Sequence, residues 1–128
     1  MALVLALAVV LLPLVGGTVL RYAWRFERGA IAAGEWWRLA SAHLVHLDAR
    51  HALANAAGLA LLWGLFARSY RPGGWLAALA VITAGVSAGL WWLTPSLQWY
   101  VGISGVLHGV FACGCVALLA ARERAGYI

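Results

Sequence analysis

Lysine is absent from this sequence, and charge of either sign is scarce. Nine arginines and four acidic residues make up 10% of the 128 residues and give a formal net charge of +5. Soluble domains carry about 25% charged residues, so this composition argues against a soluble globular protein. With 65% hydrophobic residues and a mean hydropathy of +0.89, the chain is predicted to be a single-domain integral membrane protein.

The few arginines lie at the ends of apolar runs and do not gather on one solvated face. A clustered basic face would indicate a nucleic-acid binder, whereas arginines that flank apolar runs set the orientation of membrane helices. We therefore expect the lipid bilayer as a partner and no nucleic acid.

Cysteine is also scarce. The two thiols, Cys113 and Cys115, lie two residues apart in one apolar run, which places them on well-separated faces of a helix. This spacing argues against a mutual disulfide and against a chelating pair, so both are interpreted as small packing residues. No cofactor is predicted.

A metal or haem site built from histidines is an alternative class of function. His43, His46 and His51 have mixed spacing in or beside one polar loop, and Asp48 is the one acidic residue among them. Metal sites hold their ligands at characteristic spacings, which this group does not show. Hydrogen bonding at the membrane interface is the favoured interpretation, and no metal site is predicted.

Four apolar runs are predicted to cross the membrane, at about residues 2–20, 51–67, 75–93 and 102–121. A secretory signal peptide is the alternative for the first run, although no basic residue precedes it and no clear cleavage site follows. The second run is short for a span, so its N-terminal end is expected to meet water or protein. The predicted fold class is an all-α membrane protein, a polytopic bundle with four transmembrane helices.

The connection between the first two runs, residues 21–50, is the least apolar part of the chain. It contains five of the nine arginines, three of the four acidic residues, and Trp24, Trp36 and Trp37. Aromatic rings of this kind sit at the headgroup level of a bilayer. We expect a partly helical loop that lies in the membrane interface.

Charge near the other runs predicts the orientation. Arginines follow the second and the fourth runs, while residues 94–101, on the other side, carry no charge. These arginines are Arg68, Arg71, Arg122 and Arg124. The positive-inside rule then puts the arginine-bearing side and the N-terminus in the cytoplasm, although the five arginines of residues 21–50 fall outside, against the rule.

A serine flanked by glycines opens the fourth run. Ser104 lies between Gly102 and Gly105, and a helix-capping role alone is the alternative interpretation. Gly102 permits a tight turn, and Gly105 with Gly109 forms a small-residue face that lets another helix approach closely. His108 lies one turn beyond Ser104, about 40° around the helix.

Two polar residues stand at the start of the second run. His51 and Asn55 are four residues apart, on one face of the expected helix. Polar groups in a membrane helix are costly, so they face the bundle interior or a wet cavity. Hydrogen bonding to a neighbouring helix is one interpretation. The other is acyl transfer, because Ser104 would lie at the same depth and this chemistry needs a hydroxyl nucleophile and donors for the oxyanion.

Three motifs together resemble the rhomboid intramembrane serine proteases. They are Glu35–Arg38, the spacing His46-x4-His51-x3-Asn55, and Gly102–Gly105. The longer form Gly102–Gly109 is similar to the rhombosortase subgroup. The resemblance covers about residues 34–121, and its specificity lies in the combination of the three motifs.

The resemblance implies a role for each matching residue. Ser104 would be the nucleophile, and His51, Asn55 and the Ser104 backbone N–H would form the oxyanion hole. Trp37 and Arg38 would belong to a structural loop in the outer leaflet. The implied substrate is a transmembrane or C-terminally anchored protein with a Gly-Gly-type sorting tail, cut at the outer face of a bacterial inner membrane.

One part of the family pattern is missing. Rhomboids take their general base from a histidine on a later helix, and this chain has 24 residues after Ser104. We expect either a fragment whose base and C-terminal helices lie beyond Ile128, inactive by itself, or a rhomboid-like module that binds transmembrane segments without cleaving them. His108 is the candidate stand-in base, although side chains four apart on one helix seldom reach the geometry for proton abstraction. Gly105 and Gly109 are then expected to face a helix that the chain lacks.

Overall fold

The computed structural model describes residues 16–124. Most of the first predicted span, residues 2–20, therefore lies outside the described residues. Its described end is helical and continues to residue 24, four residues beyond the predicted limit.

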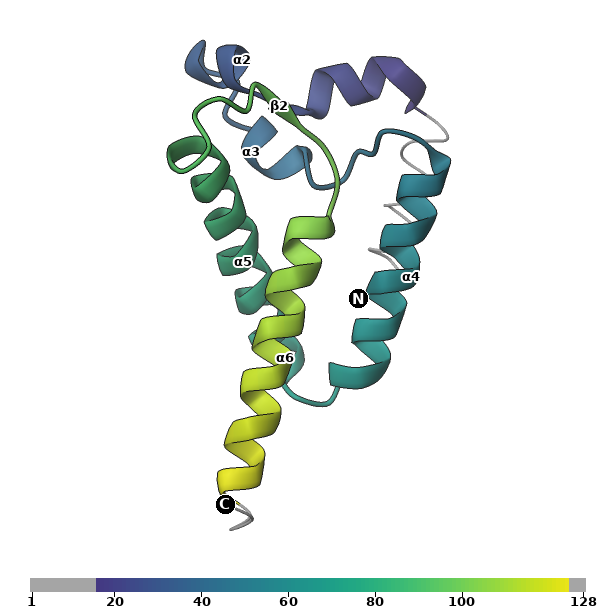
Figure 1. Cartoon of the computed structure of the whole chain (residues 1–128), viewed down its shortest axis with the longest axis vertical. Coiled ribbons are helices and arrows are strands. Elements are labelled where there is room, and N and C mark those ends of the chain that lie inside the picture. The colour runs from purple at the N-terminus through teal and green to yellow at the C-terminus, as the bar shows by residue number, and fades with distance from the viewer. Residues whose placement is uncertain (1–15, 125–128) are drawn as a thin grey trace.

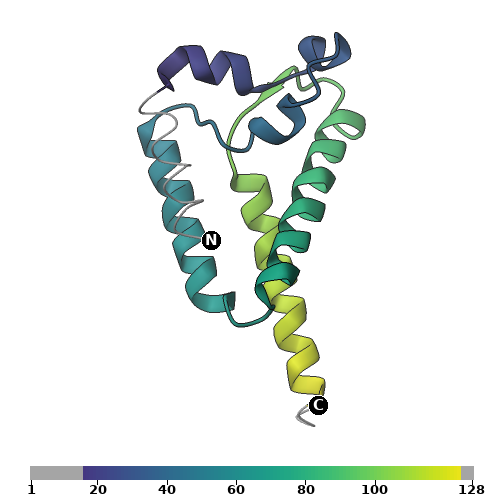
Figure 2. The same cartoon turned by 180° about the vertical axis from the view of Figure 1, so that it is seen from behind.

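Three long helices form the body of the protein: α4 (Ala49–Phe66), α5 (Pro72–Trp92) and α6 (Ser104–Arg124). α6 packs against both of the others (Figure 1). A short turn joins α4 to α5 at one end of the body, and the N-terminal ends of α4 and α6 lie together at the other end (Figures 1 and 2). His51, Asn55 and Ser104 are therefore carried to the same end of the molecule.

In the described part of the chain, α5 and α6 are the two helices that are long and apolar enough to cross a membrane. α4 occupies the second predicted run, but its first turns include Arg50, His51 and Asn55, which lower its mean hydropathy. The described part of the protein is thus mostly helical, with two candidate membrane spans.

Local sequence signals explain where the helices begin. Asp48 caps α4 because its carboxylate accepts the backbone N–H of His51 at 2.8 Å. Pro72 is the first residue of α5, where its missing N–H costs nothing. Trp75, predicted to begin this span, is instead one turn inside the helix.

The polar loop of residues 21–50 is an ordered layer over the ends of the helices. It contains β1 (Phe26–Glu27), α2 (Arg28–Ala32) and α3 (Arg38–Ser41). β1 pairs antiparallel with β2 (Trp99–Tyr100), so that Phe26 lies opposite Tyr100. The loop has its own small core, made of Phe26, Ile31 and Ala42.

Two arginines hold this layer in place. The guanidinium of Arg28 donates to the carbonyls of Leu90, Trp91, Thr94 and Leu97, and so satisfies the C-terminal end of α5. Arg38 is buried, pairs with Glu35 at 2.7 Å, and donates to the carbonyls of Tyr22 and Arg25. The loop is thereby fixed to α5 and to the helix that precedes it.

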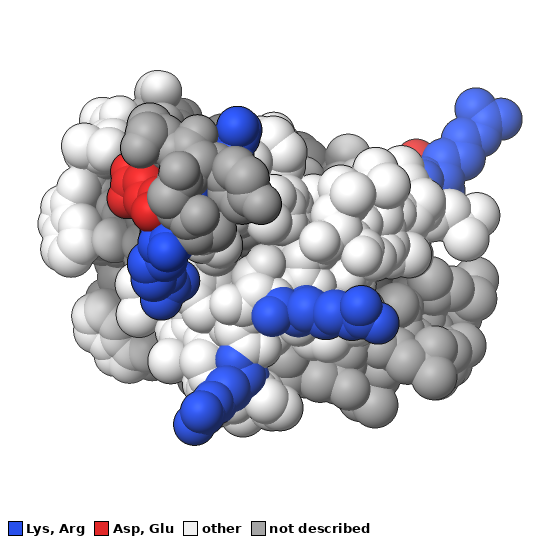
Figure 3. Space-filling model, turned by 90° about the horizontal axis from the view of Figure 1, so that it is seen from below, with Lys and Arg blue, Asp and Glu red and all other residues white. Residues whose placement is uncertain are grey.

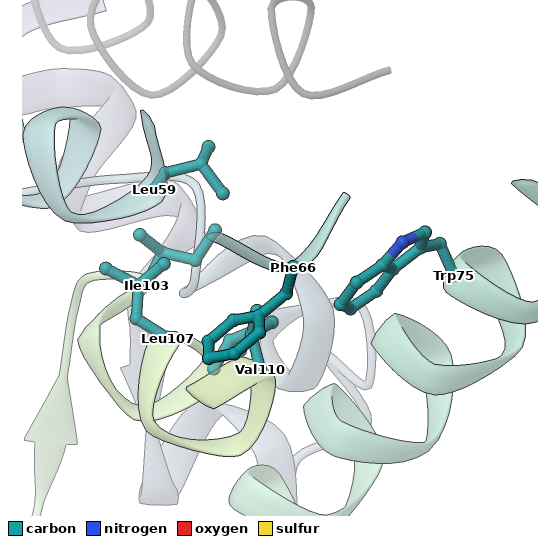
Figure 4. Close-up of a cluster of buried hydrophobic side chains, with 7 residues drawn as sticks. Leu59, Phe66, Trp75, Ile103, Leu107 and Val110 are labelled. Carbon is teal, nitrogen blue, oxygen red and sulfur yellow. The ribbon is translucent and has the colours of Figure 1, made fainter. Parts of the chain in front are cut away.

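A second core lies between the long helices (Figure 4). Leu59 and Phe66 of α4 and Trp75 of α5 meet side chains from the start of α6 and from the residue just before it. The latter are Ile103, Val106, Leu107 and Val110.

Glycines bring α6 close to its neighbours. A Cβ at Gly105 would lie 2.9 Å from Val86, and one at Gly109 would overlap Ile82. Both partners are on α5, so the expectation that these glycines face a missing helix was wrong. The two glycines correctly predicted a helix face that allows close approach, but the sequence did not indicate which helix packs against it.

Arginines dominate the end of the body opposite the loop, which Figure 3 shows from below. The α4–α5 turn contributes Arg68 and Arg71, and the last turn of α6 contributes Arg122 and Arg124. All four are exposed. The four arginines that predict the orientation therefore share one face of the molecule.

Candidate active site

Ser104 is the first residue of α6, and the turn before it is tied to the loop. Gly102 has a φ of +108°, and its N–H donates to the carbonyl of Ala42 at 2.9 Å. A residue with a side chain rarely adopts this φ, which explains the glycine. Ser104 is half-buried, at a helix end where backbone N–H groups lack partners within the helix.

The side chains of His51 and Asn55 both face this turn. A Cβ placed on Gly102 would lie 2.8 Å from Cε1 and 3.0 Å from Nε2 of His51, and 3.5 Å from Nδ2 of Asn55. The two residues from α4 are therefore brought within contact distance of the segment that presents Ser104.

The amide of Asn55 is a buried donor without a partner. The residue is 6% exposed, and its Nδ2 has no hydrogen-bond acceptor among residues 16–124. Buried polar groups are nearly always paired, so an unpaired one beside the turn that precedes Ser104 calls for a functional explanation, such as the binding of a ligand.

Contacts with the backbone settle which nitrogen of His51 carries the proton. The N–H of Leu47 donates to Nδ1 of His51 in a long hydrogen bond of 3.5 Å. Nδ1 is then the acceptor, so Nε2 carries the proton. Nε2 is also the nitrogen that lies beside Gly102, and it can donate toward the turn.

His46 supports His51 from the loop side. Its ring meets the His51 ring edge to face, with 5.0 Å between centroids. It is 2% exposed, and neither ring nitrogen has a partner within the described range. Burial, and then the electrostatic influence of the neighbouring His51, lower the pKa of His46 to about 4. His46 is therefore neutral at neutral pH.

Acidification is expected to destabilise the protein through His46. The unfolded residue titrates near 6.5 and the folded one near 4, so between these values the unfolded state binds the extra proton. Stability then falls as pH drops through this window, by on the order of 2–3 kcal/mol for a shift of this size. Thermal unfolding in detergent micelles, followed by tryptophan fluorescence at pH 7 and pH 4.5, measures it. A His46→Gln variant that kept the whole pH dependence would contradict this account.

Sequence reasoning missed two residues that border the site, His43 and Tyr100. His43 is buried, which lowers its pKa, and its Nε2 lies 3.0 Å from the hydroxyl of Ser87. Its ring contacts the edge of Tyr100 at 5.8 Å between centroids. Tyr100 lies four residues before Ser104, and only the turn at Gly102 brings its hydroxyl back to the serine.

His108 lies on the exposed side of α6. Its Nδ1 donates to the backbone carbonyl of Ser104 at 2.8 Å. The hydroxyl of Ser104 is instead 3.4 Å from that of Tyr100, and within the described residues no histidine nitrogen is hydrogen-bonded to it. The role of His108 as a stand-in base stays a prediction.

A cavity of about 790 Å³ lies between the loop and α5, away from Ser104, and is lined by residues such as Trp36, Leu39, Ala84 and Trp91. Across residues 16–124, no three His, Cys, Asp or Glu side chains are grouped so as to hold a metal ion.

Comparison with protein-family models matches residues 33–128 to the Rhomboid domain. Neither a curated protein nor a solved structure matches the chain. The matched range covers most of the sequence and contains α3 to α6 with all the residues of the candidate site. The chain therefore belongs to the rhomboid family, whose members are intramembrane serine proteases and proteins related to them.

Proposed function

We propose that the protein is an intramembrane serine endopeptidase that cleaves membrane-anchored proteins near the outer face of the membrane. One observation carries the proposal. The protonated Nε2 of His51 and the unpaired Nδ2 of Asn55 converge on the turn that presents Ser104. A purely structural serine cap would not need two side-chain donors at this place.

In this proposal the hydroxyl oxygen of Ser104 attacks the carbonyl carbon of the scissile peptide bond, and its proton passes to a base. The carbonyl oxygen becomes an oxyanion, which accepts hydrogen bonds from His51 Nε2, Asn55 Nδ2 and the Ser104 backbone N–H. Donors that are already aimed at the developing charge lower the barrier without reorganisation. We expect the base to be a histidine on a later helix, as in the family, with His108 as the alternative within this sequence.

We further propose the rhombosortase subgroup and a substrate with a C-terminal Gly-Gly-type sorting tail. The motif Gly102–Gly109 supports this assignment. A bacterial inner membrane, four transmembrane helices and a cytoplasmic N-terminus complete the proposal. The arginine-bearing face opposite the loop supports the orientation, because it would lie in the cytoplasm while Ser104 lies near the outer surface (Figure 3).

Removing the amide of Asn55 tests the oxyanion hole. Asn55→Ala in the full-length protein is expected to lower kcat by about 10²–10³, with little change in KM, because this donor acts chiefly in the transition state. The assay is cleavage of a membrane-anchored substrate with a Gly-Gly tail in proteoliposomes, with Ser104→Ala as background.

The matched control is Gln98→Ala. Gln98 is exposed in the loop between α5 and β2, and among the described residues its side-chain amide is bonded only to the carbonyls of Pro95 and Ser96. The Gln98→Ala variant should keep wild-type turnover. A loss in Asn55→Ala confined to KM would show that Asn55 packs against its neighbours and does not donate to the oxyanion.

A rhomboid-like module that binds transmembrane segments without cleaving them is the second candidate. The absence of a histidine on the Ser104 hydroxyl within residues 16–124 favours it. Crosslinking to the substrate, with no cleavage above the Ser104→Ala background, would establish this function instead.

A further inference from the structure

The hydroxyl of Tyr100 lies between Ser104 and the backbone of α6. Its oxygen is 3.4 Å from the Ser104 hydroxyl oxygen and accepts the N–H of Gly105 at 3.3 Å. The phenol oxygen therefore accepts a backbone N–H and shares a second hydrogen bond with Ser104 Oγ, in which either hydroxyl can donate.

This arrangement changes what the serine does at the helix start. A capping serine accepts the N–H two or three residues further on, but the N–H of Leu107, three residues beyond Ser104, donates to the carbonyl of Ile103. Within the described residues the only hydrogen-bond partner of Ser104 Oγ is the phenol, which also accepts the N–H of Gly105. Tyr100 thus satisfies a free N–H of the first turn and holds the serine hydroxyl with the same oxygen.

The tyrosine ring is itself held from two sides. Tyr100 pairs with Phe26 in the two-stranded sheet, and its ring meets His43 edge to face. Ser87 of α5 donates to the carbonyl of Leu39, so His43 Nε2 donates to the Ser87 hydroxyl. The loop and α5 together set where the phenol hydroxyl lies.

We infer that Tyr100 is a positioning residue for the nucleophile, which holds the hydroxyl of Ser104 at the start of α6 and oriented for attack. This inference rests on the proposed protease function. It does not make Tyr100 the base, which is expected on a later helix.

The test is the rate at which a fluorophosphonate probe labels Ser104 in the full-length protein. In this reaction the serine oxygen forms a bond to phosphorus, fluoride leaves, and the serine proton is lost to the base. Tyr100→Phe keeps the ring and its contacts with His43 and Phe26 but removes the hydroxyl. We expect the maximal inactivation rate to fall about threefold to tenfold, with the half-saturating probe concentration unchanged.

Tyr70→Phe is the matched control. Tyr70 donates to the carbonyl of Cys113, also on α6, so this variant loses a comparable hydrogen bond at 3.0 Å without touching the serine. Its labelling rate should equal that of the wild type. The two variants should have similar melting temperatures, which shows that the loss at Tyr100 is not one of folding.

A second variant, Ser87→Ala, removes the anchor of His43 without touching Ser104, and we expect a smaller loss of about twofold. Wild-type labelling no faster than that of Ser104→Ala would overturn the proposed function itself. Wild-type labelling with unchanged rates in both Tyr100→Phe and Ser87→Ala would overturn the positioning role alone. An effect confined to the half-saturating concentration would also contradict it.

Discussion

Replacing Ser104 by alanine is expected to lower peptide-bond cleavage by about 10⁶, the loss typical of a missing serine nucleophile. The substitution removes the atom that attacks, so neither the donors of α4 nor the base can compensate. Packing should change little, because the hydroxyl makes one hydrogen bond among the described residues, to Tyr100.

The measurement is cleavage of a membrane-anchored substrate by reconstituted full-length protein. Ser96→Ala is the control, since Ser96 is an exposed serine in the loop before the same helix. Cleavage that persisted in Ser104→Ala at more than a trace would mean that another residue is the nucleophile.

Gly102→Ala is expected to lower kcat by about 10²–10³ although the changed residue carries no reactive group. The new Cβ would lie 2.8 Å from Cε1 and 3.0 Å from Nε2 of His51, so this proposed donor must move, while 3.5 Å to Nδ2 of Asn55 is an ordinary contact. Each donor contributes about 10²–10³, and a displacement of about 1 Å already costs about 10². Backbone strain at a φ of +108° adds a loss of stability of about 1–3 kcal/mol.

Gly34→Ala separates the loss of stability caused by backbone strain from the loss of activity caused by contact with His51. Gly34 has a nearly equal φ of +106°, and nothing among the described residues lies within 4 Å of its added Cβ. It should lose stability as Gly102→Ala does and keep its turnover. Equal activity in the two variants would show that Gly102 serves the backbone only.

The sequence predicted the helices more surely than the site. Apolar runs located α5 and α6, and the four-residue spacing placed His51 and Asn55 on one face. The predicted helix starts differ from the observed ones by a few residues, since α5 begins at Pro72 and its span was predicted to begin at Trp75. Periodicity gives the face of a helix but not its neighbour, which is why the partner of Gly105 was wrong.

Tyr100 and His43 escaped prediction for a different reason. Their contacts depend on the pairing of β1 with β2 and on the bond between Gly102 and Ala42. None of these partners is close in sequence, and no motif of polar residues marks them. Such contacts follow from tertiary structure, which a single sequence does not display.

The pairing of Phe26 with Tyr100 also bears on how the protein folds. These residues are 74 positions apart, and α4 and α5 lie between them. A contact between residues so distant in sequence closes a long loop, and the entropy lost in closing that loop precedes the energy gained from the contact. Such contacts therefore form slowly. Helices can form in the membrane from local hydrogen bonds alone. The surroundings of Ser104 therefore come late in folding, after the long helices and only when the interfacial loop has docked across their ends.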